Sequence, residues 1–307
     1  MRYIVTGGAG FIGSNLVKSL ADRGDSVIVI DDFSFGNMEN LKDVADRVKL
    51  IRGDLADAAF AMDSIRDTDV VFHLAANGSI RKSSEDPMFD FRSNVVATVN
   101  VLEAMRRNDI PRILFTSSSA VYGRPEKTPV SEDDMTVPVS NYGRSKLCAE
   151  NYIRGFSEFY GIKGVVLRYA NIIGPGCVRG IIPDFVEKLS NNPNSLEILG
   201  DGNQMRSYLD IRDCIGATLA ASNSAKTYDV YTVGSERWTS VDEIAKMVTN
   251  AMGLEHVKLE HTGGKIGWKG DVDRILMDVY KIKKLGWKSE IGVEESVVRT
   301  VDWLMKR

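Results

Sequence analysis

Cysteine and histidine are scarce in this chain, and their scarcity excludes several kinds of site. Of the 307 residues, three are cysteines and three are histidines. Cys148, Cys177 and Cys214 are scattered and form no CxxC pair, so we expect reduced packing residues and no disulfide framework. The histidines are equally dispersed, so we expect no metal site. His73 ends an apolar run and is expected to be a satisfied core residue.

Excess basic charge and long apolar runs are missing as well. The net charge is −3 at pH 7, so no basic field would attract nucleic acid or an anionic membrane surface. We find no signal peptide and no apolar run long enough to span a bilayer, and therefore expect a cytoplasmic protein. The hydrophobic content of 43 % is enough for one large core or two moderate ones.

The chain does contain a regular alternation of short apolar runs and longer amphipathic stretches. Strands are predicted over 3–6, 26–31, 48–54, 69–76, 112–118 and 164–170, and helices over 11–24, 59–67, 88–108 and 143–161. This order predicts an α/β fold with a Rossmann-type, doubly wound parallel sheet. After about Gly174 the elements become shorter and mixed, so we predict a Rossmann domain over 1–173 and a smaller α/β lobe over 174–307.

A glycine loop follows the first predicted strand. In "VTGGAGFIGS", Gly7, Gly10 and Gly13 allow a tight turn and a close approach of backbone N–H groups to a pyrophosphate at the start of a helix. A glycine triplet alone also fits a plain strand-to-helix turn. Asp31 ends the second strand, where dinucleotide-binding folds place an acid on the adenosine ribose. Because that acid would repel a 2′-phosphate, we expect NAD rather than NADP.

Hydroxyl groups collect at the end of another predicted strand. In "ILFTSSSAVYG", residues 116–119 can reach a reacting oxygen at the edge where open parallel sheets bind ligands, although serine clusters are usually turns. Tyr142 and Lys146 follow in "NYGRSK", at a spacing that places both on one helix face. Tyr280 and Lys284 repeat this spacing in a lysine-rich segment without a glycine loop or serine strand end, and we interpret that pair as solvated.

Together these motifs are the signature of short-chain dehydrogenase/reductases. "HLAAN", "LRYANIIGP", "LEILGDGNQMRSYLDIRD" and "WKGDV" extend the resemblance to the extended branch of that family, over nearly the whole chain. The similarity is greatest to UDP-glucose 4-epimerases, which interconvert UDP-glucose and UDP-galactose. The resemblance implies tightly bound NAD that is regenerated in each cycle, a UDP-sugar substrate and a homodimer.

The resemblance also implies a set of site residues. Tyr142, as phenolate, would take the proton of the sugar 4-hydroxyl, Ser118 would hydrogen-bond the same oxygen, and Lys146 would hold the nicotinamide ribose and lower the tyrosine pKa. The expected cofactor-binding residues are Gly7, Gly10, Phe11, Ile12, Gly13, Asp31, Asp32, Ser34, Gly36, Asp54, Leu55, Leu74, Ala75, Ala76, Asn94, Tyr142, Lys146 and Tyr169. The expected substrate-binding residues are Ser118, Tyr142, Asn171, Ile181, Arg206 and Asp271. For Asp54 and Leu55, a strand-end cap remains the other interpretation.

Two departures from the family pattern bear on the substrate. Trp268 stands where bacterial relatives often have a diphosphate-binding arginine, a role that Lys265 or Lys269 could take. Ile275 stands where a bulky tyrosine can exclude N-acetylated sugars, which leaves UDP-N-acetylhexosamines as alternative substrates.

Two other functions compete with epimerisation. Related dehydratases and decarboxylases need acidic residues where this chain has Ser119 and Ala120, which favours the epimerase. A non-catalytic NAD-binding regulator would commonly lack the tyrosine or the lysine, and both are present. Galactose catabolism and glycan synthesis are not distinguished by the sequence, and neither are a uracil and a thymine base. The predicted helices at 88–108 and after Tyr142 could form the dimer interface or serve the core.

Overall fold

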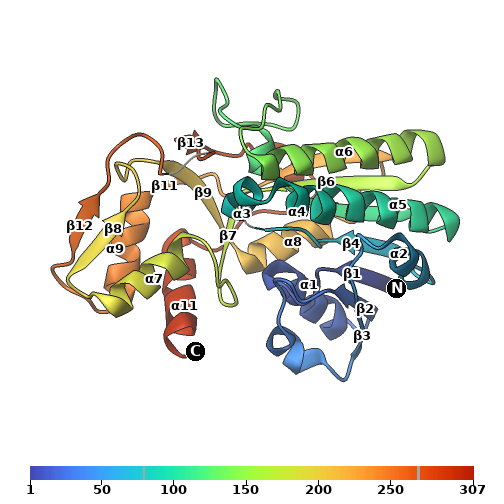
Figure 1. The fold of residues 1–307 in the computed structure, drawn as a ribbon, viewed down its shortest axis with the longest axis horizontal. Helices are drawn as coiled ribbons and strands as arrows, with labels where there is room; N and C mark the ends of the chain where they lie inside the picture. Colours follow the sequence, from blue (N-terminus) through green and yellow to red (C-terminus); the bar gives the residue numbers. More distant parts are fainter. Residues whose placement is uncertain (79, 268–269) are drawn as a thin grey trace. The chain divides into compact units, whose positions relative to one another are not determined.

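The computed structural model describes residues 1–78, 80–267 and 270–307, which form two compact units (Figure 1). The first unit comprises residues 1–123, 136–168 and 218–231, and the second comprises 124–135, 169–217 and 232–307. The predicted division after residue 173 lies near the switch at 168/169. The sequence did not predict that residues 124–135 belong to the second unit and residues 218–231 to the first.

A seven-stranded sheet forms the centre of the first unit. Its strands lie in the order β10-β6-β5-β4-β1-β2-β3. Their bounds are β1 (Arg2–Thr6), β2 (Ser26–Asp31), β3 (Val48–Arg52), β4 (Val70–His73), β5 (Arg112–Ser118), β6 (Lys163–Tyr169) and β10 (Tyr228–Val233). β1 pairs in parallel with both β2 and β4, Tyr3 lying opposite Val27 and Val70. This order confirms the predicted doubly wound sheet, whose ligands bind beyond the carboxyl ends of the strands.

Helices cover this sheet on both faces, and together they close an apolar core. Their bounds are α1 (Phe11–Asp22), η1 (Met38–Val44), α2 (Ala58–Ser64), α3 (Ile80–Glu85), α4 (Pro87–Phe91), η2 (Arg92–Val96), α5 (Ala97–Arg107), η3 (Ser119–Val121) and α6 (Asn141–Tyr160). Helices α2, α5 and α6 pack side by side, and α1 packs against η1 (Figure 1).

The helix predicted over 88–108 runs without a break from residue 87 to residue 107 and contains a π-helical turn. α4 starts at Pro87 with Asp86 as its N-cap, and a π-helical turn, η2, precedes α5. Such turns insert a residue into a helix and often occur at functional sites. Ser140 caps α6 by accepting a hydrogen bond of 3.1 Å from the Gly143 N–H, which fixes the start of the helix that carries Tyr142 and Lys146.

The second unit confirms the expected shorter, mixed elements. They are β7 (Asn171–Ile173), α7 (Ile181–Asn191), β8 (Ser195–Ile198), β9 (Met205–Asp210), β11 (Trp238–Ser240), α9 (Val241–Ala251), β12 (Lys258–His261), β13 (Arg274–Ile275), α10 (Tyr280–Lys283) and α11 (Val293–Met305). α8 (Ile211–Ala221) begins in this unit and ends in the first. β9 pairs with β7, β11 and β13, and α7, α9 and α11 pack around a separate core. No described helix of the chain is long and apolar enough to cross a membrane.

Candidate active site

The glycine loop between β1 and α1 has the shape of a phosphate cradle. Gly7 has a φ of +65°, and a Cβ there would lie 2.7 Å from the backbone nitrogen of Ala75. A Cβ on Gly13 would overlap the carbonyl oxygen of Gly7. Gly10 is the N-cap of α1 and offers no side chain, so the first N–H groups of the helix, on Phe11 and Ile12, can point at an anion.

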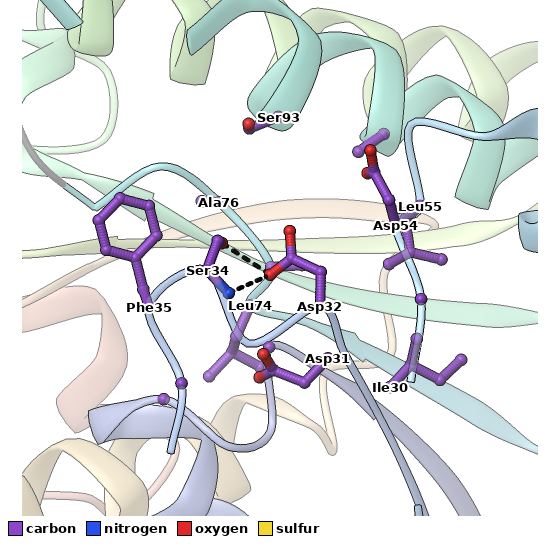
Figure 2. Close-up of a pocket in the computed structure, with 16 residues that line it drawn as sticks. Ile30, Asp31, Asp32, Ser34, Phe35, Asp54, Leu55, Leu74, Ala76 and Ser93 are labelled. Atoms are coloured by element: carbon purple, nitrogen blue, oxygen red, sulfur yellow. Dashed lines mark hydrogen bonds between the residues drawn. The ribbon is translucent and has the colours of Figure 1, made fainter. Parts of the chain in front are cut away.

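A cavity opens beside this loop (Figure 2). Most of the predicted cofactor-binding residues line it, namely Gly7, Gly10, Asp31, Asp32, Ser34, Gly36, Asp54, Leu55, Leu74, Ala75 and Ala76. The lining also includes five residues that were not predicted from the sequence, namely Ile30, Phe35, Gly53, Ser93 and Ala97. The first four are each next to a predicted residue in the chain, so their neighbours carried the only signal. A deep cavity beside a glycine loop and a helix N-terminus fits a dinucleotide.

Two adjacent carboxylates follow β2 at this cavity. Asp31 is buried, and its oxygens accept hydrogen bonds from the N–H groups of Ala9 at 2.9 Å and Phe33 at 2.8 Å. Burial raises the pKa of Asp31, and these two hydrogen bonds oppose the rise. Asp32 accepts hydrogen bonds from the N–H and hydroxyl of Ser34 at 2.8 and 2.6 Å (Figure 2). Two carboxylates here disfavour the extra phosphate of NADP.

Two contacts connect the rim of the cavity to the helical segment formed by α4 and η2. Phe35 and Asp54 lie on opposite sides of the cavity, with Ser93 of η2 between them (Figure 2). The ring of Phe35 lies 6.4 Å from that of Phe89 in α4, between centroids. Asp54 accepts a hydrogen bond of 3.3 Å from Arg92 in η2. The helix segment therefore contacts the loops after both β2 and β3.

The predicted catalytic side chains meet beside the end of β5. Ser118, the last residue of β5, shares a hydrogen bond with Tyr142. Lys146 is 2 % exposed and donates a hydrogen bond of 2.9 Å to the carbonyl oxygen of Thr116, also on β5. Its Nζ lies 6.0 Å from the centroid of the Tyr142 ring. The strand and the start of α6 therefore bring the three predicted residues together.

The chain's own groups do not lower the pKa of Tyr142. Burial raises that pKa to about 12, while the hydrogen bond with Ser118 opposes the rise and the charge of Asp90 adds to it. Burial lowers the pKa of Lys146 to about 8, against the charges of Asp90 and Glu150. The lowering of the tyrosine pKa by the ammonium, expected from the sequence, is not found in the chain alone, where burial dominates.

Asn94, predicted to bind the cofactor, lies in a buried polar network. Its amide nitrogen donates to Ser145 Oγ at 2.8 Å and to Asp90 Oδ1 at 3.2 Å, and its oxygen accepts the Asn77 N–H at 2.8 Å. Asn77 also donates to Asp90 Oδ1 at 3.0 Å. Of the other predicted cofactor residues outside the cavity lining, Tyr169 ends β6 and is buried.

A buried ion pair below the catalytic helix was also missed. Arg168 of β6 donates to Glu150 of α6 at 2.8 Å, and both side chains are buried. Ser117 donates a short hydrogen bond of 2.5 Å to the same carboxylate, which connects this pair to the strand end that carries Ser118. The spacing offered a signal, because Glu150 follows Lys146 by the same four residues that separate Lys146 from Tyr142.

The predicted nucleotide-binding residues lie in the second unit. Arg206 of β9 donates to Asp271 at 2.7 Å and to the carbonyl oxygen of Asp273 at 3.0 Å, so the two predicted partners of UDP are paired with each other. Asn171, at the start of β7, hydrogen-bonds the side chain of Tyr208. Ile181 is the first residue of α7.

Two of the residues at which this chain could differ from its relatives in substrate binding are described, Ile275 and Lys265. Ile275 is buried in β13, in register with Arg206 of β9. Lys265 is exposed, and Trp268 and Lys269 lie outside the described residues.

Several predictions of ordinary roles are confirmed. Tyr280 is 66 % exposed, and Lys284 Nζ lies 4.3 Å from the centroid of its ring, as expected for a solvated pair. His73 is fully buried between the hydroxyls of Thr6 and Thr98, at 2.7 and 3.0 Å. The three cysteines are free, as expected.

The described residues include no group of three or more His, Cys, Asp or Glu side chains that could hold a metal ion.

Known proteins similar to this chain are nucleotide-sugar enzymes. The sequence profile of the NAD dependent epimerase/dehydratase family matches residues 3–234. A putative UDP-glucose 4-epimerase of Methanocaldococcus jannaschii is 36 % identical, over 98 % of this chain and 97 % of the relative. The structure of the Thermotoga maritima UDP-glucose 4-epimerase with UDP-glucose superposes with a TM-score of 0.92 and 31 % identity, covering 100 % and 99 % of the two chains. The structure of a UDP-N-acetylglucosamine 4-epimerase from Methanobrevibacter ruminantium superposes with a TM-score of 0.91 and 30 % identity. The match covers 99 % of this chain and 98 % of that chain.

Proposed function

Since the chain belongs to the NAD-dependent epimerase/dehydratase family, we propose that it interconverts UDP-glucose and UDP-galactose with NAD as its cofactor. The observation that carries the proposal is the cluster of Ser118, Tyr142 and Lys146 in the same unit as the glycine cradle. A base beside a dinucleotide site suits the oxidation of an alcohol and the reduction of the ketone on its other face.

The catalytic side chains divide the proton chemistry between them. Tyr142, as phenolate, accepts the proton of the sugar 4-hydroxyl and returns it to the product, and Ser118 holds the same oxygen by a hydrogen bond. NAD, when bound, would supply the hydride acceptor and a positive nicotinamide ring that favours the phenolate. Lys146 holds the nicotinamide ribose and adds a second positive charge near Tyr142. Because the pKa of Tyr142 is about 12 in the chain alone, Lys146 included, the positive charge of the cofactor is needed for the phenolate to form near neutral pH.

The nucleotide is held by residues of the second unit. Arg206 binds the diphosphate, a role suited to the planar guanidinium, and Asp271 accepts from the uridine ribose. Asn171 and Ile181 complete this part of the site. Because Arg206 and Asp271 are paired with each other in the structure, binding of UDP would replace that ion pair by contacts to the nucleotide.

A UDP-N-acetylhexosamine is the second candidate substrate. Ile275 has the smaller side chain at the position where a tyrosine can exclude the N-acetyl group, and one structural neighbour is a UDP-N-acetylglucosamine 4-epimerase. Turnover of UDP-galactose without turnover of UDP-N-acetylglucosamine would contradict this candidate.

We also propose a homodimer, formed through the face of α4 and α6. Large apolar side chains are exposed there, namely Met88, Phe91, Tyr152 and Phe159. Burial of such a face in a second copy would remove its apolar surface from water. The molar mass from light scattering tests this: Phe91→Glu should shift a dimer to a monomer, and a monomeric unaltered protein would contradict the proposal.

The first experiment omits added cofactor. Protein purified without NAD is incubated with UDP-galactose, UDP-glucose is followed by chromatography, and an acid extract is assayed for NAD. We expect turnover and co-purified NAD, loss of turnover in Tyr142→Phe, and unchanged turnover in the exposed control Tyr280→Phe. Bound NAD with no turnover of UDP-galactose or UDP-N-acetylglucosamine would contradict the proposed substrates.

A further inference from the structure

We infer that the buried ion pair between α6 and β6 is a clamp that positions Ser118 against Tyr142. The pair consists of Arg168 on β6 and Glu150 on α6, the helix that also carries Tyr142. The inference rests on the proposed function only for the reaction that this positioning serves. Glu150 and Arg168 act through Ser118 and are therefore positioning residues.

The two charged groups of the clamp hold each other through several hydrogen bonds. Arg168 Nη2 donates to Glu150 Oε2 at 2.8 Å, and Arg168 Nε lies 3.2 and 3.3 Å from the two carboxylate oxygens. The arginine side chain is 8 % exposed and the glutamate side chain 3 %. A planar guanidinium that meets a carboxylate at several atoms has a fixed orientation relative to it. The pair is therefore a firm connection between α6 and β6.

Each member of the pair also holds one end of the segment that contains Ser118. Ser117, directly before it, donates a hydrogen bond of 2.5 Å to Glu150 Oε1. Arg168 Nη1 donates to the hydroxyl of Tyr122 at 3.0 Å, and its guanidinium carbon lies 5.0 Å from the centroid of that ring. Tyr122 is 1 % exposed and is the C-cap of η3. The clamp thus holds the chain on both sides of the catalytic serine.

The segment needs such support because the sheet ends there. Ser118 is the last residue of β5, and after Gly123 the chain leaves the first unit. The oxygen of Ser118 accepts a hydrogen bond of 3.2 Å from the Ala120 N–H and also shares a hydrogen bond with Tyr142. A shift of the backbone beyond the end of the strand would move this oxygen away from the phenol and weaken the second bond.

Helix α6 carries both the clamp and the catalytic side chains. Tyr142, Lys146 and Glu150 follow one another at intervals of four residues, about one helical turn. The start of the helix also lies close to the segment after β5, because a Cβ on Gly143 would lie 2.5 Å from the carbonyl oxygen of Ala120. One rigid helix therefore presents the phenol and, one turn beyond the lysine, holds the end of the strand that carries the serine.

Two conservative variants release the segment and leave the ion pair in place. Ser117→Ala removes the hydroxyl bound to Glu150, and Tyr122→Phe removes the hydroxyl bound to Arg168. Glu150→Gln is less suitable, because it would leave Arg168 as a buried cation without its carboxylate and destabilise the whole protein. We expect each of the two variants to lower kcat for UDP-galactose about threefold to tenfold with little change in KM, because a misplaced Ser118 affects the transition state more than substrate binding.

A double-mutant cycle shows whether these losses pass through Ser118. In Ser118→Ala the clamp has no hydroxyl left to place, so adding Ser117→Ala or Tyr122→Phe should lower kcat no further. Losses that multiply would overturn the inference. Two controls each remove a buried hydroxyl elsewhere and should leave kcat unchanged: Ser157→Ala, bonded to a carbonyl oxygen of its own helix at 2.9 Å, and Tyr231→Phe on β10, bonded to a carboxylate at 2.7 Å.

A titration that needs no sugar tests the same positioning. The hydrogen bond with Ser118 opposes the rise in the pKa of Tyr142, so a weakened bond should raise that pKa. The ultraviolet absorbance of the phenolate is followed against pH in the NAD-loaded protein, with the matching Tyr142→Phe protein subtracted. We expect a higher midpoint in Ser117→Ala and in Tyr122→Phe, and no further rise when either is added to Ser118→Ala.

The two readouts separate the clamp from the proposed function. Unchanged midpoints in the folded Ser117→Ala and Tyr122→Phe proteins would overturn the clamp, whatever the substrate. The expected midpoints in a protein that turns over no UDP-sugar would support the clamp and contradict the proposed function.

Discussion

At the scale of single residues, the cradle glycines are distinguished by what a side chain would meet. A Cβ on Gly13 would overlap the Gly7 carbonyl oxygen, whereas a Cβ on Gly155, inside α6, would meet no atom within 4 Å. We expect Gly13→Ala to cost about 1–3 kcal/mol of stability and to lose co-purified NAD. Gly155→Ala should gain about 0.5–1 kcal/mol and keep NAD. Urea unfolding and the NAD content of each protein check both, and NAD bound normally by Gly13→Ala would contradict the cradle.

His73 predicts how stability depends on pH. Its folded pKa is about 3, against 6.5 when unfolded, because burial between Thr6 and Thr98 favours the neutral ring. Below pH 6.5 the unfolded state therefore binds more protons, and the free energy of unfolding falls as pH falls. The fall is about 1.4 kcal/mol per pH unit from this group. Urea unfolding between about pH 6.5 and 5 should show this excess slope relative to His73→Gln, and equal slopes would contradict it.

The limits of the sequence are also clear at this scale. Ser118, Tyr142 and Lys146 could be predicted because their spacing and order fix the chemistry. The partner of Glu150 could not, because Arg168 lies on β6 and its pairing depends on how that strand packs against α6. The direction of the pKa of Tyr142 depends on burial, which no spacing reveals.

At the scale of elements, the strands of the sheet were predictable because each is a short apolar run between turns. The π-helical turn was not, since apolar periodicity over 88–108 is continuous and the extra residue is fixed by tertiary contacts. That turn places Ser93 in the cavity lining, next to the predicted Asn94.

The contacts of α4 and η2 with the cavity rim lead to a prediction of how firmly the cofactor is retained. The contacts of Phe89 with Phe35 and of Arg92 with Asp54 link this segment to both sides of the cavity rim. Each contact contributes about 0.5–1 kcal/mol, so Phe89→Ala combined with Arg92→Ala should release NAD several-fold faster. Loss of NAD during dialysis measures this. Lys42→Ala breaks a comparable exposed ion pair with Glu39 away from the cavity and should release NAD at the original rate.

At the scale of the whole molecule, the chain passes between its two units more than once. The sheet of the first unit is completed at one edge by β10, beside β6, so residues 1–173 alone lack an edge strand. We expect the fragment 1–173 to aggregate or to unfold well below the temperature of the full chain, because β6 would present an unpaired edge. Circular dichroism and light scattering decide this. A monomeric fragment with full-length stability would show that β10 is dispensable.

The hydrogen bonds of Asp31 have a consequence for evolution. The carboxylate that disfavours NADP also ties the backbone of Ala9 in the glycine loop to that of Phe33, so one residue serves both selectivity and architecture. A lineage that changed to NADP could not simply replace this side chain, because the backbone N–H groups of Ala9 and Phe33 would both lose their hydrogen-bond acceptor. Gly36 is constrained as well, since a Cβ there would lie 2.8 Å from Asp31 Oδ1. Coenzyme preference in this protein is thus inherited together with loop shape, and we expect the two to change together or not at all.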